Sequence, residues 1–181
     1  SVAAVERRIG ELEARGRTVV LVALGGRLVG LRALQDGLRP GARAAVQHHL
    51  NVLEDAPAML ALCEREGLAS INRAPLAMGL LSGKFSADSR LPRDDVRGSG
   101  AEWLTAFDAD GRPRGEFLDR LAAIRESLTA DGRTLVQGAL GWIWARSDCT
   151  IPIPGFKTVA QAEENAGALA FGPLAADRMQ E

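Results

Sequence analysis

The alternation of short apolar strands with helices constrains this chain more than any other feature of its sequence. Continuous or β-branched apolar runs predict strands at residues 18–24, 44–47, 68–72 and 150–153. Residues with a helical pattern lie between these runs. Strands that alternate with helices favour right-handed βαβ units around a parallel sheet.

This pattern predicts an α/β fold of about four βα units. Four units are half of a (β/α)8 TIM barrel, which takes about 250 residues when complete. A small open α/β sheet is the alternative, because both architectures alternate strands with helices. In either case we expect residues 1–181 to form a single domain.

Several predicted boundaries can be tested against a structure. The segment through Leu31 and Leu34 is predicted to be helical, and Asp55 is the expected N-cap of the next helix. Residues 76–115 are rich in Gly, Pro, Asp and Arg, which predicts a long loop. Loops of this length in a compact domain are usually functional. The charged residues at 90–97 are interpreted as a solvated part of that loop.

The composition excludes several classes of function. The formal net charge of -1 gives sequence-independent nucleic-acid binding no electrostatic basis. No run approaches the roughly 20 apolar residues of a membrane span, and residues 1–8 have the pattern of an amphipathic helix, not of a signal peptide. Two isolated cysteines predict neither a disulfide scaffold nor a metal site and favour a cytoplasmic protein. The absence of tyrosine excludes that residue as a general acid.

An anion site is predicted where the last strand meets the last helix. Thr158 and Gln161 fit the S/T-x-x-E/Q capping box, so a purely structural role for both stays open. Lys157 opposes the positive end of the helix dipole unless an anion is bound there. Gly155 permits close approach of the backbone to a ligand. The order strand, glycine, lysine, helix therefore indicates a phosphate site.

A second glycine-rich segment, residues 73–84, follows the third strand and ends in Lys84. Its glycine spacing is not that of a P-loop, so a phosphate loop and an ordinary surface loop both stay open. His48 and His49 are neighbours on a predicted strand and face opposite ways, so they cannot chelate one metal. One of the two is expected to face the site.

Three motifs, in the right order, resemble those of bacterial aldo-keto reductases. Residues 46–51 (VQHHLN) resemble the motif of that family's sixth barrel strand, and residues 74–84 (APLAMGLLSGK) are similar to the motif of the seventh. Residues 151–157 (IPIPGFK), with polar positions in the helix that follows, resemble the signature of the eighth. The linker at 95–98 (DVRG) also looks like that family.

The resemblance implies the C-terminal half of a (β/α)8 barrel, strands five to eight, that binds extended NADP(H) without a Rossmann fold. It implies that Gln47 holds the nicotinamide carboxamide and that the planar guanidinium of Arg73 stacks on the nicotinamide ring. The pyrophosphate would be lined by Leu76, Gly79 and Lys84. The adenosine, its ribose and its 2′-phosphate would be held by Gly155, Phe156, Lys157, Gln161, Glu164 and Asn165.

Two departures from the family pattern limit this prediction. The family's catalytic Asp, Tyr, Lys and His come from strands two to four, which have no equivalent here, so no catalytic residue is assigned. Leu24-Gly25 stands where strand five normally ends in a polar pair that binds the carboxamide. The chain is expected to be the cofactor-binding half of an NADPH-dependent reductase of small aldehydes or ketones. The alternatives are a non-catalytic half-barrel that associates with itself or with a partner half, and a degenerate paralogue.

Overall fold

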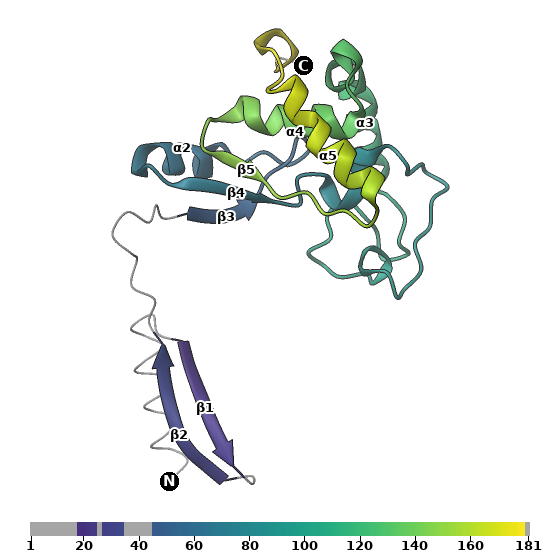
Figure 1. The fold of residues 1–181 in the computed structure, drawn as a ribbon. Coiled ribbons are helices and arrows are strands. Elements are labelled where there is room, and N and C mark those ends of the chain that lie inside the picture. Colours follow the sequence, from purple (N-terminus) through teal and green to yellow (C-terminus); the bar gives the residue numbers. More distant parts are fainter. Residues whose placement is uncertain (1–17, 25–26, 35–44, 180–181) are drawn as a thin grey trace. The chain divides into compact units, whose positions relative to one another are not determined.

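The computed structural model describes residues 18–24, 27–34 and 45–179 of the chain (Figure 1). Where the sequence predicts a single domain, the structure divides the chain into two compact units, Ser1–Ala42 and Arg43–Glu181. The residues predicted to bind the cofactor all lie in the second unit.

The first unit contains an antiparallel hairpin. β1 (Thr18–Leu24) pairs with β2 (Arg27–Leu34), with an irregular register between Val22 and Ala23. The predicted helix through Leu31 and Leu34 is therefore wrong. Two glycines between apolar runs are a hairpin signal, and Gly30 disfavours a helix interior. The helical pattern of residues 1–8 lies outside the described residues.

The second unit contains a parallel sheet in the order β3-β4-β5. Its strands are β3 (Ala45–His49), β4 (Ala69–Arg73) and β5 (Thr150–Pro152). Since β1 pairs with β2 in a separate sheet, the parallel sheet has three strands within the described residues, where the sequence predicts four. The predicted strand–helix alternation around a parallel sheet is confirmed for these three.

The described residues include four α-helices beside this sheet, namely α2 (Pro57–Glu66), α3 (Gly115–Leu128), α4 (Leu135–Arg146) and α5 (Val159–Phe171). The N-cap of α2 is Ala56 and not the predicted Asp55. Pro57 fixes that start, because proline is favoured at the first helical position. The Asp55 carboxylate instead pairs with Arg146 at 2.8 Å.

The predicted long loop of residues 76–115 is present, but it is anchored by apolar side chains. It includes the short 3-10 helices η1 (Ala77–Ser82) and η2 (Val96–Gly98). Buried residues of the loop join those of α3 and α4 in one core cluster, which includes Leu80, Leu81, Phe107, Phe117, Leu128 and Leu135. No helix in the described part of the chain is long and apolar enough to cross a membrane.

The two faces of the parallel sheet differ in exposure. Side chains alternate between faces along a strand, and the buried Ser70 and Asn72 of β4 alternate with Ile71 and Arg73, which are less buried. In the strand register Ile71 lies beside Gln47 of β3 and Ile151 of β5, both of which are exposed. The face that carries these residues, called the open face below, is accessible.

Candidate functional site

The open face brings together the two residues predicted to meet the nicotinamide. Gln47 pairs in register with Ile71, and Arg73 follows Ile71 by two positions on the same strand. Both side chains therefore lie on the open face of adjacent strands, and both are exposed. Arg73 ends β4, so it lies at the carboxyl edge of the sheet, where parallel α/β proteins place their ligands.

The segment after β4 has an unusual backbone. Ala74, Ala77 and Met78 have φ values of 51°, 46° and 55°, and Gly79 has a φ of 91°. A non-glycine residue held in this left-handed region costs about 1–3 kcal/mol, and such residues cluster at functional sites. The strained backbone at residues 74–79 therefore favours a functional loop over an incidental one.

The predicted pyrophosphate residues occupy different positions in this loop. Leu76 is half-buried, and its side chain packs against the main core cluster. Gly79 lies in the strained segment. Lys84 is exposed, with its Nζ 4.9 Å from the ring centre of Phe85.

A half-buried ion pair in contact with this segment was not predicted from the sequence. Asp95 and Arg97 belong to the charged run interpreted as solvated, yet their side chains are only 21% and 14% exposed. Arg97 Nη1 donates a hydrogen bond to the carbonyl oxygen of Met78 at 3.2 Å. Hydrogen bonds from Arg97 hold the pKa of the Asp95 carboxyl well below its usual range. The local signal was the Asp-x-Arg spacing, in which an aspartate accepts from the backbone two residues on.

The start of α5 has the predicted cap. Thr158 Oγ1 accepts from the backbone N–H of Gln161 at 3.2 Å. Gln161 Oε1 accepts from the N–H of Lys157 at 2.7 Å, so the reciprocal bond of a capping box goes one residue further back. Both glutamine contacts stabilise the turn that carries Lys157, whose side chain is exposed. A Cβ on Gly155 would meet open space, so a ligand has room there.

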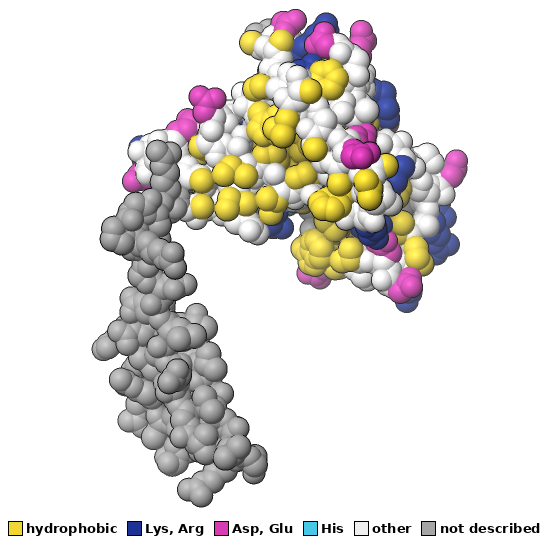
Figure 2. Space-filling model, in the orientation of Figure 1, with side chains coloured by type: hydrophobic (Ala, Val, Ile, Leu, Met, Phe, Trp, Pro, Cys, Tyr) yellow, Lys and Arg dark blue, Asp and Glu magenta, His cyan; other side chains and the backbone are white. Residues whose placement is uncertain are grey.

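A groove of about 460 Å³ runs beside β5 and α5. It is lined mainly by apolar side chains, and Figure 2 shows hydrophobic side chains gathered in this region. Phe156 and Asn165, two of the residues predicted to hold the adenosine, line it, whereas Glu164 is not part of the lining. The Glu164 carbonyl instead accepts from Gln137 Nε2 at 3.4 Å. Asn165 Nδ2 is buried and finds no hydrogen-bond partner among the described residues.

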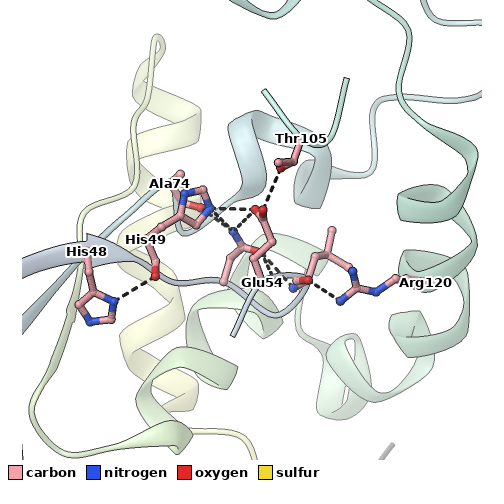
Figure 3. A network of polar contacts seen from close by, with 8 residues as sticks. His48, His49, Glu54, Ala74, Thr105 and Arg120 are labelled. Atoms are coloured by element: carbon pink, nitrogen blue, oxygen red, sulfur yellow. Dashed lines mark hydrogen bonds and ion pairs between the residues drawn. The ribbon is translucent and has the colours of Figure 1, made fainter. Parts of the chain in front are cut away.

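The two histidines have different partners. His49 Nε2 lies 2.9 Å from Glu54 Oε2 and 2.9 Å from Asn51 Nδ2 (Figure 3). Asn51 Nδ2 also reaches the carbonyl oxygen of Ala74 at 3.2 Å, so this network ties the end of β3 to the strained loop. His48 Nε2 lies 2.8 Å from Ser70 Oγ. Of the two, His49 is the one that lines a small cavity of about 30 Å³, which also touches Arg73.

Among residues 18–24, 27–34 and 45–179, no group of three or more His, Cys, Asp or Glu side chains is placed to hold a metal ion. Cys63 and Cys149 are free thiols, and burial raises the pKa of Cys63.

Known proteins similar to this chain are reductases. It is 34% identical over 110 residues to a chloroplastic pyridoxal reductase of Arabidopsis thaliana, a match that covers 61% of this chain and 27% of that protein. It is 30% identical over 110 residues to an aldo-keto reductase of Schizosaccharomyces pombe whose name specifies NADP(+), with coverages of 59% and 30%.

A solved structure is similar as well. An aldo-keto reductase from Bacillus halodurans, known in an apo and a holo form, superposes with a TM-score of 0.51 at 27% identity. That match covers 76% of this chain and 41% of the apo-form chain. The matched part of the chain therefore covers between 27% and 41% of the length of these relatives.

The family assignment rests on more than single relatives. The sequence model of the Aldo/keto reductase family matches residues 39–181, which include all three motifs and every residue predicted to hold the cofactor. Together with the parallel sheet and the structural similarity, this match shows that the chain belongs to the aldo/keto reductase family.

Proposed function

We propose that this chain binds NADP(H) and is the cofactor-binding half of a cytoplasmic reductase of small aldehydes or ketones. The observation that carries the proposal is the groove beside α5, which Phe156 and Asn165 line and which lies at the helix whose start follows Lys157. An adenine ring offers a flat face for the exposed Phe156.

The phosphate groups of the cofactor match the charged residues near the groove. Lys157 precedes the first turn of α5, so its ammonium and the helix N-terminus would act together on a 2′-phosphate. Gly79 and Lys84 would receive the pyrophosphate, and Gln47 and Arg73 the nicotinamide. The NADP(+) in the name of the fission yeast relative supports the same choice of nucleotide.

In this proposal the bound cofactor supplies the hydride that reduces the carbonyl carbon. The chain's own residues bind and orient it against the open face. The 181 residues contain no tyrosine, so the proton donor for the carbonyl oxygen would come from the complementary half of the barrel.

The open face favours association with such a half, or with a second copy of this chain. Ile151 in β5 and Ile153 just after it are 49% and 46% exposed, and exposed apolar side chains of this kind are normally covered. We expect light scattering on the purified chain to give a mass above 19.2 kDa, or to do so once the complementary half is added. A monomer under both conditions would contradict the association.

The cofactor proposal predicts a difference between two nucleotides. We expect Lys157→Ala to weaken NADPH binding about tenfold and NADH binding hardly at all, because only NADPH offers the 2′-phosphate that makes a charge-assisted hydrogen bond. Quenching of tryptophan fluorescence measures both affinities, since Trp144 lines the groove.

Arg65→Ala is the matched control. This arginine is exposed in the last turn of α2 and pairs with its neighbour Glu66, so its loss removes the same charge without touching the groove. No saturable quenching by either nucleotide in the unaltered chain would refute the proposed function. Equal weakening of NADPH and NADH by Lys157→Ala would refute the assignment of the 2′-phosphate.

A further inference from the structure

The Asp95–Arg97 pair is built more firmly than an ordinary surface ion pair. Arg97 Nε donates to Asp95 Oδ1 at 2.8 Å, and Arg97 Nη2 donates to Oδ2 at 2.5 Å, which makes a bidentate contact. The backbone N–H of Arg97 also donates to Oδ1 at 3.0 Å. Bidentate arginine–carboxylate pairs fix geometry as well as charge. The guanidinium therefore has one orientation relative to the backbone of η2.

In that orientation Arg97 Nη1, which does not contact Asp95, points toward the strained loop of residues 74–79. Arg97 Nη1 donates to the carbonyl oxygen of Met78, the residue with a φ of 55°. The guanidinium carbon also lies 5.4 Å from the ring centre of Phe85, just after Lys84. The Arg97 side chain thus contacts both ends of the segment 78–85. A strained backbone persists only where its surroundings hold it, and Arg97 is such a support.

The charge of Asp95 is also relevant to a nearby anionic ligand. Hydrogen bonds from Arg97 are the main cause of the low pKa of the Asp95 carboxyl, and the charge of Lys157 adds to them. An unpaired carboxylate beside a phosphate site would repel the ligand. The bidentate contact with Arg97 neutralises it.

We propose that Asp95 and Arg97 are positioning residues for a pyrophosphate-bearing nucleotide. Arg97 holds the Met78 carbonyl so that the backbone from Gly79 to Lys84 keeps the conformation that receives the pyrophosphate, and Asp95 holds Arg97. The inference rests on the proposed function for the identity of the ligand, but the positioning itself is a property of the unliganded chain.

Hydrogen exchange of the unliganded chain tests the positioning directly. In Arg97→Ala we expect backbone amides of residues 77–84 to exchange about tenfold faster than in the unaltered chain, while those of α4 stay unchanged. Asp95→Asn should accelerate the same amides about threefold, since it keeps the shape of the side chain but weakens its hold on Arg97. Arg93→Ala, an exposed change in the same loop, is the control. Unchanged exchange at 77–84 in both variants would overturn the inference.

Two ligands of different length distinguish a positioning role of Arg97 from a general loss of structure in the Arg97→Ala variant. NADP(+) spans the pyrophosphate loop, whereas adenosine 2′-monophosphate reaches only the start of α5 and the groove. We expect Arg97→Ala to weaken NADP(+) about tenfold and adenosine 2′-monophosphate less than twofold. Equal loss for both would mean that the variant disturbs the whole unit, and would overturn the inference. If the unaltered chain binds neither ligand, the proposed function fails, and hydrogen exchange alone then decides for or against the positioning role.

Discussion

Replacing Gly138 by alanine is expected to lower the free energy of unfolding of the second unit by about 3 kcal/mol, at the upper end of the usual cost of overpacking. Gly138 lies in α4, where a Cβ would overlap the carbonyl oxygen of Leu128 and lie 2.6 Å from its carbonyl carbon. Leu128 ends α3 and is 2% exposed, so the two helices would have to separate within the core. Since whole domains are stable by only about 5–15 kcal/mol, a large fall in the urea midpoint should follow.

Gly115→Ala is the matched control for that substitution. A Cβ there meets nothing within 4 Å, and Gly115 begins α3 without a left-handed φ. Alanine favours the helix by up to about 1 kcal/mol, so the control should be neutral or slightly more stable. Similar midpoints for the two variants would contradict the close helix approach that the structure describes.

Local chemistry explains which elements could be predicted from the sequence. The cap of α5 at Thr158 depends on residues within one helical turn, and it was predicted. The wrong prediction of a helix through Leu31 and Leu34 has a different cause. An apolar run of that length fits either a helix or a strand, and the choice came from pairing with β1 across the Gly25-Gly26 connection.

The same contrast between local and long-range contacts applies to the candidate site. Phe156 and Asn165 were predicted from the resemblance, and the structure brings both to one groove. The contact of Arg97 with the strained loop was missed because its acceptor, the carbonyl oxygen of Met78, lies nineteen positions earlier in the chain. Spacing within a charged run cannot reveal a contact with a distant loop. Glu164 does not line this groove, and its predicted contact with the adenine stays a prediction.

Asn51, the last residue of the strand-six motif, leads to the second large expected effect. It is fully buried, and its Oδ1 accepts from the N–H groups of Leu53 and Glu54 at 2.9 and 3.1 Å. We expect Asn51→Ala to lower the free energy of unfolding by about 3 kcal/mol, because a buried N–H without an acceptor costs about 1–3 kcal/mol. The Ala74 carbonyl would lose its amide donor as well. Urea denaturation followed by circular dichroism measures the change.

Asp108 offers a control with the same local geometry and a different environment. Its Oδ1 also accepts from two nearby backbone N–H groups, of Asp110 and Arg112, each at 2.9 Å, but in an exposed turn. Water can replace the lost acceptor there, so Asp108→Ala should cost about 1 kcal/mol, the net value of an ordinary hydrogen bond. If both variants lose the same stability, burial of the acceptor is not what makes Asn51 important. A clear excess for Asn51→Ala would identify the link between the end of β3 and the strained loop as a structural support of the proposed cofactor site.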